Sequence, residues 1–464
     1  MPREEGEETE PGKKVGDAVA GPPDPARPAV REVRFGRHSM REVARTGGKA
    51  PSVRWRDRRR FSCYDVAMAY DAFTIDTNLA IEGGLNLEGG LLGQLTQFKD
   101  GQIDLILSEI VVREVRKHLN LQVKKVRDTL VSLAARAEEV QLTEGDAAAE
   151  LKAKVEALGD PRDVAGARLK KYFEDTGATT IPVKLASIDA LVRGYFSASP
   201  PFDATGAKKS EFPDAIALLA IEAWATKSGK KVLAVSKDKG WADFAANCDV
   251  IDVEPDFAKA LQIVQEHAEE ASARVGAILE AVEAGGLPEI AAAIEEGLRR
   301  GLPGWPIHGE GGGAFYLELD SAELEFESYT LIKDGDGYDI TIVRMGSNQV
   351  VARIGAEMKA TARADFSLSV WDSIDKEYVG MGGQSAETTI EFDGAFLLTI
   401  GGDLAGDPAD LEAEEVEIVE AIDEVDFGEI EFDPGDEDYE EWLAEDADAD
   451  VAVEGQAAIE PPAF

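Results

Sequence analysis

The run AFTID, residues 72–76, followed at once by Thr77 and Asn78, decides how the chain is interpreted. An apolar, partly β-branched run that ends in an acid is typical of a buried strand that presents a carboxylate at its carboxyl edge. The run KKVLAVSKD, residues 230–238, ends in the same way at Asp238. Helical and short apolar extended segments alternate from Gly83 to Trp241, which predicts an α/β fold.

Two further acids lie on predicted helices. Glu114 belongs to SEIVVREVRKHL, residues 108–119, and Asp214 opens FPDAIALLAIEAW, residues 212–224. With Asp76 and Asp238, they could converge on one small volume from two strand ends and two helices. Convergent carboxylates repel one another unless cations lie between them, so this arrangement predicts a metal site.

Each acid also has an ordinary structural interpretation. Asp214 could stabilise a helix N-terminus, Asp238 could be a turn residue, and Glu114 could pair with basic neighbours on a solvated helix face. Asp76 is harder to explain in this way, because an acid that ends an apolar strand is costly to bury without a partner. Three nearby acids are weaker candidates for accessory roles: Glu109, Glu211 and Asp243.

Five motifs occur in a telling order: FTIDTNL (73–79), SEIVVREV (108–115), PPFDATGAKKSEFPDA (200–215), EFPDAIALLAI (211–221) and VLAVSKDKGW (232–241). The ordered set resembles the PIN-domain nucleases, and within them a larger bacterial PIN-like subgroup, over roughly residues 70–256. The resemblance implies a parallel sheet flanked by helices, with Asp76, Glu114, Asp214 and Asp238 as catalytic metal ligands. It also implies products with 5′-phosphate and 3′-hydroxyl ends and an RNA substrate.

The donor set bears on the identity of the ion. Carboxylate oxygens suit hard ions such as Mg²⁺ or Mn²⁺, whereas zinc prefers nitrogen and sulfur. The four histidines are dispersed, and the two cysteines, Cys63 and Cys248, have no metal-binding spacing. These observations favour a metal-dependent endonuclease. Nothing in the spacing distinguishes RNA from DNA.

Other functions remain open at this point. One is a non-catalytic PIN-like binding or scaffold protein, and another is a DNA structure-specific nuclease with the same acids. A phosphatase of the haloacid dehalogenase type is disfavoured, because Asn78 replaces its second aspartate. The glycine-rich run 83–93 matches no nucleotide-binding motif.

The formal net charge of −43 is unusual for a nucleic-acid enzyme, but it is unevenly distributed. No Lys or Arg follows Lys376, whereas basic clusters occur in the 70–256 region. Candidate phosphate contacts flank the acids: Lys208, Lys209, Lys237 and Lys239. They could equally be solubilising surface charge. The aromatic residues Tyr195, Trp224 and Trp241 are interpreted as core rather than as base-stacking platforms.

Composition divides the chain into five parts. Residues 1–67 should be a disordered arm whose basic part could contact nucleic acid, although an inert tail or translated upstream sequence is favoured. Residues 70–256 should be the nuclease domain, with a mostly helical insertion between Asn120 and Phe196. Residues 257–304 should be a helical connector that packs on the nuclease domain or forms the dimer seam of a homo-oligomer, and a linker at 309–314 should lead into the next part. Residues 312–403 should be an antiparallel β domain, a sandwich or small barrel, with an unknown protein partner. Residues 404–464 should be a disordered acidic tail that is solubilising or occupies the basic groove in cis.

Location is also an expectation. No stretch of about 18 apolar residues that could span a membrane is seen, so no membrane partner is expected. Two cysteines cannot form a disulfide framework, which favours a reducing compartment. We therefore expect a cytoplasmic protein.

Overall fold

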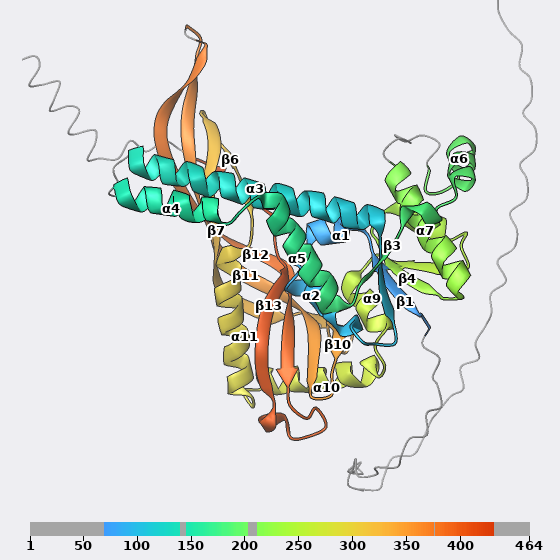
Figure 1. The fold of residues 1–464 in the computed structure, drawn as a ribbon. Coiled ribbons are helices and arrows are strands. Elements are labelled where there is room, and N and C mark those ends of the chain that lie inside the picture. The colour runs from blue at the N-terminus through green and yellow to red at the C-terminus, as the bar shows by residue number, and fades with distance from the viewer. Residues whose placement is uncertain (1–68, 140–144, 203–210, 375, 431–464) are drawn as a thin grey trace, which may run out of the picture. The chain divides into compact units, whose positions relative to one another are not determined.

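The computed structural model describes residues 69–139, 145–202, 211–374 and 376–430 (Figure 1). The predicted arm at 1–67 and the part of the predicted tail beyond residue 430 lie outside this range. Within the described residues, no helix is both long and apolar enough to cross a membrane.

A parallel sheet forms the first part of the fold. In the described chain it has five strands, β1 (Ala72–Ile75), β2 (Asp104–Ser108), β3 (Thr179–Ile181), β4 (Val232–Val235) and β5 (Ile251–Glu254), in the order β3-β2-β1-β4-β5. All neighbouring pairs are parallel. The central strands β1 and β4 are buried throughout, which explains their unbroken apolar runs. The predicted α/β class and parallel sheet are confirmed.

Helices cover both faces of this sheet. They are α1 (Thr77–Glu82), α2 (Gly90–Gly93), η1 (Gln94–Phe98), α3 (Glu109–Glu139), α4 (Gly145–Ala157), α5 (Pro161–Thr176), η2 (Val183–Leu185), α6 (Ile188–Ser197), α7 (Phe212–Ser228), α8 (Lys239–Ala245) and α9 (Phe257–Ile263). Successive residues of β1 point to opposite faces. Ala72 therefore joins a core with α7, while Phe73 and Ile75 join a core with α3, α5 and α9.

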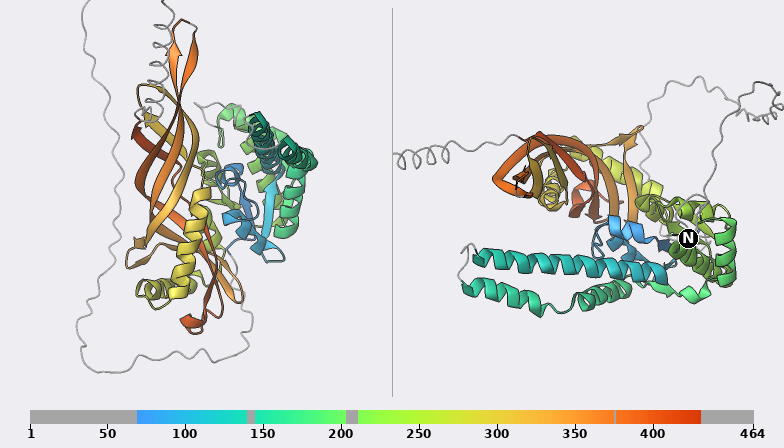
Figure 2. Two further views of the ribbon diagram at one scale, coloured as in Figure 1. Left: turned by 90° about the vertical axis from the view of Figure 1, so that its left-hand side faces the viewer. Right: turned by 90° about the horizontal axis from the view of Figure 1, so that it is seen from above.

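The predicted helical insertion is largely helical but not entirely so. Helix α3 continues to Glu139, and α4 runs back beside it (Figure 2). The short strand β3, however, lies inside the predicted insertion and pairs with β2 in the parallel sheet. Three residues are too short a run to show a strand period, which is why the sequence pattern did not reveal it.

A second sheet follows two helices, α10 (Ala268–Glu283) and α11 (Pro288–Gly301), and the turn η3 (Leu302–Gly304). Its strands are β7 (Tyr316–Leu331), β10 (Ile340–Met345), β11 (Gln349–Asp372), β12 (Glu377–Gly401) and β13 (Glu412–Glu420). They are antiparallel in the order β10-β11-β12-β13, with β7 also on β11. Short elements complete this part: β6 (His308–Gly312), β8 (Lys333–Asp334), β9 (Gly337–Tyr338), η4 (Pro408–Asp410) and β14 (Glu424–Glu429).

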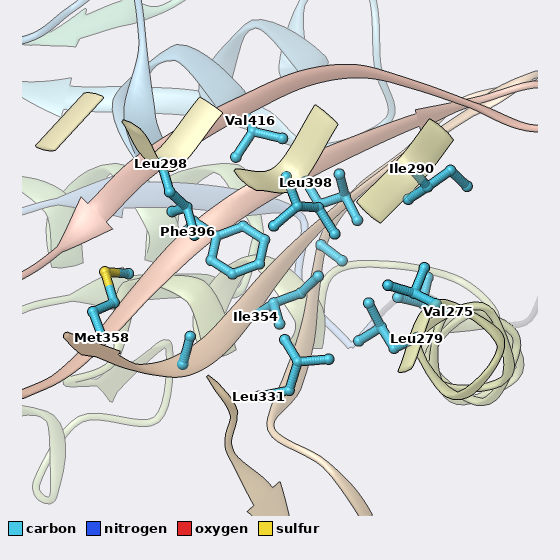
Figure 3. Close-up of a cluster of buried hydrophobic side chains, with 14 of the residues drawn as sticks. Val275, Leu279, Ile290, Leu298, Leu331, Ile354, Met358, Phe396, Leu398 and Val416 are labelled. Carbon is cyan, nitrogen blue, oxygen red and sulfur yellow. The ribbon is translucent and has the colours of Figure 1, made fainter. Parts of the chain in front are cut away.

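Helices α10 and α11 pack on this sheet rather than connecting two domains. Figure 3 shows Val275 and Leu279 of α10 and Leu298 of α11 in one cluster with Phe396 and Leu398 of β12. The expected sandwich or barrel is therefore wrong: helices, not a second sheet, cover the apolar face. The apolar faces of these helices needed a partner, and the sheet supplies it.

Two boundaries predicted from composition were also wrong. The glycine-rich segment 309–314, expected to be a linker, contributes β6, which pairs with β14. Residues 404–430, expected to belong to the disordered tail, form η4, β13 and β14, with Val416, Val425 and Ile430 buried. In EAEEVEIVE, residues 412–420, acids interleave with apolar residues as in a half-buried strand, but the acidic composition concealed that pattern.

The antiparallel sheet shares a core with the parallel-sheet region. Val343, Val351 and Leu397 belong to the same buried cluster as Phe73 and Leu95. The amide Nε2 of Gln97 donates to the Val343 carbonyl at 3.0 Å. Two donors from the glycine-rich segment, the Gly90 backbone N–H at 2.7 Å and Asn86 Nδ2 at 3.2 Å, reach the Glu417 carboxylate on β13. The glycine-rich segment is thus anchored to the second sheet.

Candidate metal and nucleic-acid site

The strand order creates a natural site between β1 and β4. From β1 the chain adds β2 and β3 on one side of the sheet, and later β4 and β5 on the other. In open α/β sheets, ligands bind outside the carboxyl ends of strands at such a switch point. Asp76 follows β1 directly, and Asp238 lies three residues beyond the end of β4.

Asp76 is the most constrained acid of the group. It is only 3% exposed and caps α1, where its Oδ1 accepts the Thr77 backbone N–H at 2.6 Å. Its Oδ2 accepts a hydrogen bond from the Ser236 hydroxyl at 2.9 Å. Burial raises the pKa of the Asp76 carboxyl, the two hydrogen bonds oppose that rise, and the charges of Asp238 and Glu114 add to it.

Ser236 links two of the acids. It is 1% exposed, donates to Asp76, and its Oγ accepts the Asp238 backbone N–H at 3.1 Å. Asp238 is the N-cap of α8, and its Oδ1 accepts the Gly240 N–H at 2.6 Å. The second Asp238 oxygen has no hydrogen bond within the described residues. This serine thus fixes the spacing between the ends of β1 and β4.

Glu114 is held by Thr77, a residue that lies just beyond the end of β1. The buried Thr77 hydroxyl donates to Glu114 Oε2 at 2.7 Å, across 37 positions of sequence. The residue is half-buried on α3, between the buried Val111 and Val115 that anchor this helix face. Thr77 therefore contacts one acid through its backbone and another through its side chain.

Asp214 enters from the opposite side of the sheet. It lies in the first turn of α7, and its Oδ1 accepts a hydrogen bond from the Trp241 indole at 3.2 Å. Burial raises the pKa of Asp214 to about 6; the Trp241 hydrogen bond opposes that rise, and the charges of Asp76, Asp238 and Glu114 add to it. Trp241 is fully buried, in agreement with its interpretation as a core residue.

The charges of the four acids influence one another, but their side chains do not converge closely enough to surround one ion. Within the described residues, no three His, Cys, Asp or Glu side chains are close enough together to hold an ion. Burial raises the pKa of Asp76 and of Asp214; the charges of Asp238 and Glu114 add to both rises, and the charge of Asp76 adds to the rise at Asp214. Oxygen donors of this kind suit a hard divalent cation, whose charge would cancel the repulsion.

The weaker acidic candidates lie elsewhere or have other contacts. Glu109 accepts the Val183 backbone N–H at 3.0 Å and pairs with Arg113, so it ties α3 to the segment after β3. Asp243 pairs with Lys239 at 2.6 Å. Glu211 is the N-cap residue of α7.

The predicted phosphate-binding lysines receive little support from the geometry. Lys237 pairs with Glu82 at 2.7 Å, and Lys239 with Asp243. Both lysines are well exposed. Lys208 and Lys209 lie outside the described residues.

Sequence patterns did not single out the residues that position the acids: Thr77, Ser236 and Trp241. A hydroxyl residue next to a strand end gives no periodic signal, and whether it faces a carboxylate depends on the sheet register. The one available signal is proximity, because Thr77 and Ser236 lie within two residues of Asp76 and Asp238. Trp241 shows no signal of its contact with Asp214, since 27 positions separate them.

The fold and site define a class: an α/β protein with a carboxylate cluster at the switch point of a parallel sheet. Residues 74–241 match the family model described as PIN domain, and this part of the chain is a PIN domain. The matched range contains Asp76, Glu114, Asp214 and Asp238, and the predicted family resemblance is confirmed. PIN domains are nuclease-type folds that typically use divalent metal ions. No curated protein and no solved structure matches the chain significantly.

Proposed function

We propose that this protein is a metal-dependent endonuclease that hydrolyses phosphodiester bonds, with RNA as the substrate. The observation that supports the proposal is the position of Asp76 and Asp238 just after β1 and β4, at the switch point, with Glu114 and Asp214 held towards them by Thr77 and Trp241. Two of these carboxyls have a raised pKa caused by burial and by each other's charge. Maintaining such a cluster costs stability, and perturbed carboxyls of this kind concentrate at functional sites.

Mg²⁺ or Mn²⁺ fits the oxygen-only donor set, and Asp76, Glu114, Asp214 and Asp238 would hold it. When bound, such an ion lowers the pKa of a water and neutralises charge that develops on the phosphodiester. The chain's own residues prepare the donors. Ser236 and the Thr77 backbone N–H hold Asp76, the Thr77 hydroxyl orients Glu114, and the Trp241 indole orients Asp214.

These contacts leave particular oxygens available. Asp214 Oδ2 and the second oxygens of Asp238 and Glu114 have no hydrogen bond among the described residues, whereas both Asp76 oxygens already accept one. Hydrogen bonds of this kind fix ligand rotamers and typically affect metal affinity or activity by about 10- to 100-fold. The arrangement therefore supports a pre-oriented ligand set. A cytoplasmic location belongs to the proposal and rests on the substrate class and the low cysteine content.

The test compares purified wild type with Asp76→Asn and Asp214→Asn on fluorescent single-stranded RNA, RNA hairpins and DNA flaps, each with Mn²⁺, Mg²⁺ or EDTA. We expect cleavage of RNA that needs the ion and falls at least about 100-fold in each variant, because one carboxylate charge is lost from the ligand set.

Asp104→Asn is the matched control. Asp104 begins β2 at the opposite edge of the same sheet and pairs with Lys230 at the surface, so its loss should leave cleavage unchanged. Unaltered cleavage by both site variants would refute the proposal. Absence of cleavage under every divalent ion would favour a binding or scaffold role, and cleavage of DNA flaps alone would change the substrate.

A further inference from the structure

A basic hollow lies between α3 and α5, close to the carboxylate cluster but separate from it. It has a volume of about 720 Å³, and the residues that matter here are Arg113, Arg116 and Lys117 on α3 and Arg162, Asp163 and Gly166 on α5. Four cations therefore face one acid. None of these residues is among the predicted phosphate contacts.

The helical period brings the α3 cations together. Arg113, Arg116 and Lys117 stand at positions i, i+3 and i+4, so they share one face of the helix. Both α5 residues that bear charge in the hollow are exposed in the first turn of that helix. The two helices pack against each other, which fixes the four cations in one concave surface.

Little negative charge lies beside these cations, although the chain has a net charge of −43. About half of the exposed Lys and Arg side chains in the described residues form an ion pair. Among those same residues, Arg116, Lys117 and Arg162 form no ion pair, and only Arg113 does, with Glu109. A cluster of like charges that lacks partners is costly in itself, which indicates an anionic ligand.

The hollow begins next to the candidate ligand Glu114. Arg113 directly precedes Glu114. Lys117 follows Glu114 by three residues, so the Cβ atoms of Glu114 and Lys117 lie roughly 5–6 Å apart. From residue 113 to residue 120, α3 rises about 10 Å, so the hollow extends only a short distance along the helix from Glu114. A strand cleaved at the carboxylates can therefore reach the hollow within its next few phosphates.

We infer that this hollow binds the sugar-phosphate backbone of the nucleic-acid substrate on one side of the scissile bond. Guanidinium groups bind phosphate oxygens in bidentate fashion, and lysine adds a point charge. The lining of the hollow contains no aromatic side chain among the described residues, so it would hold phosphates and not stack bases. The inference rests on the proposed nuclease function and adds a substrate-binding surface to it.

The first test removes three cations, with the variant Arg116→Gln/Lys117→Gln/Arg162→Gln. Binding of a fluorescein-labelled 12-nucleotide RNA is measured by anisotropy in EDTA over a salt series. Three lost phosphate contacts should lower the slope of log Kd against log salt by about 2, at about 0.7 per contact for a single strand. The dissociation constant at 0.1 M salt should rise at least about tenfold.

The matched control is Lys152→Gln/Lys227→Gln/Arg300→Gln, which removes three exposed cations on α4, α7 and α11. It changes the net charge equally but leaves the hollow intact. We expect its affinity and salt slope to stay close to wild type. An equal loss in both triple variants would overturn the inference, because only net charge would then matter.

A second pair of variants tests the same surface by addition. A Cβ at Gly166 meets nothing within 4 Å, so a side chain fits there without displacement. Gly166→Glu and Gly166→Lys both improve helix propensity, by roughly 0.5–1 kcal/mol, so folding is preserved. We expect Gly166→Glu to weaken RNA binding at least about fivefold and Gly166→Lys to strengthen it. Equal dissociation constants for the two would refute the inference.

A small substrate separates this inference from the proposed function. Bis(p-nitrophenyl) phosphate reaches the carboxylates without occupying the hollow. With Mn²⁺, the variants that change the hollow should hydrolyse this compound at the wild-type rate, while Asp214→Asn should not. Loss of this hydrolysis in the variants that change the hollow would overturn the inference. If wild type hydrolyses neither substrate but RNA binding still depends on the hollow, the nuclease proposal fails and the binding surface stands.

Discussion

At the scale of single residues, the site is a set of acids held in an unfavourable environment. Asp76 is buried and Asp214 half-buried near the other carboxylates, and among the described residues hydrogen bonds from Ser236, Thr77 and Trp241 offset part of that cost. Such arrangements persist when function requires them, and they lower the stability of the fold that carries them.

Removing one charge should stabilise the protein when no metal is present. The pKa of Asp214 is raised to about 6 in the folded state, above the ordinary value of 3.8, so its contribution to stability is highest below pH 3.8 and falls as pH rises towards 6. Above pH 6 the full cost is present. Asp214→Asn, which retains an acceptor for Trp241, should therefore raise the free energy of unfolding at pH 8 in EDTA by about 1–2 kcal/mol.

Urea denaturation at pH 8 and at pH 4 measures this difference, which should shrink at the lower pH. Addition of Mn²⁺ should reverse the order, because an ion that binds only the folded wild type stabilises it by mass action. A variant less stable than wild type in EDTA at pH 8 would contradict the expectation. Equal stabilisation of both proteins by Mn²⁺ would place the ion elsewhere.

Ser236 should act as a positioning residue. Ser236→Ala removes the donor to Asp76 and the acceptor of the Asp238 N–H, so both carboxylates lose a constraint. We expect RNA cleavage to fall about 10- to 100-fold, and the Mn²⁺ concentration for half-maximal activity to rise about tenfold. A titration of activity against Mn²⁺ gives both values.

Ser108→Ala supplies the comparison. Ser108 is equally buried at the end of β2, but its hydroxyl accepts the Ile110 N–H, and among the described residues it makes no hydrogen bond to any of the four acids. Both variants should lose about 1–3 kcal/mol of stability. Only Ser236→Ala should shift the Mn²⁺ requirement, and the same shift in Ser108→Ala would show a purely structural effect.

At the scale of elements, sequence patterns were reliable where a strand or helix is long or fully apolar. The ends of β1 and β4 could be placed because a buried strand of a parallel sheet reads as one apolar run, and Asp76 and Asp238 follow those runs. β3 and β13 could not, since one has three residues and the other is rich in acids. The contacts among the four acids depend on register and helix packing, which no local pattern encodes.

Close packing of α11 on β13 should be sensitive to one added methyl group. A Cβ at Gly297 would lie 2.4 Å from Val416 Cβ and 2.8 Å from its Cγ1, and Val416 is a buried, branched residue that cannot move aside easily. We expect Gly297→Ala to lower the free energy of unfolding by about 1–3 kcal/mol, even though alanine favours helix. Urea denaturation monitored by circular dichroism measures it.

Gly166→Ala is the matched control, because it is also a helical glycine but has open space around it. It should leave stability unchanged or raise it by up to about 1 kcal/mol. If Gly297→Ala were as stable as Gly166→Ala, α11 would not pack on β13 as closely as described.

At the scale of the whole molecule, the two sheets should unfold together. Val343, Val351 and Leu397 of the antiparallel sheet are buried in the same cluster as Phe73 and Leu95 of the PIN domain. Melting either part alone would expose that shared apolar surface, at about 25 cal/mol per Å². Single-tryptophan variants that report from Trp241 and from Trp305 should therefore give coincident urea midpoints in EDTA. Two urea midpoints that differ by more than about 0.5 M would show that the two sheets unfold independently.

Helix α3, with 31 residues, has one more consequence. It carries Glu114, one of the four proposed metal ligands, and the cations inferred to hold the nucleic-acid strand. Because an α-helix is rigid, it fixes the distance between Glu114 and these cations. If both roles hold, the number of nucleotides between the held phosphates and the cut becomes a constant of this enzyme, independent of sequence. Lengthening or shortening this helix beyond residue 120 would leave that constant unaltered.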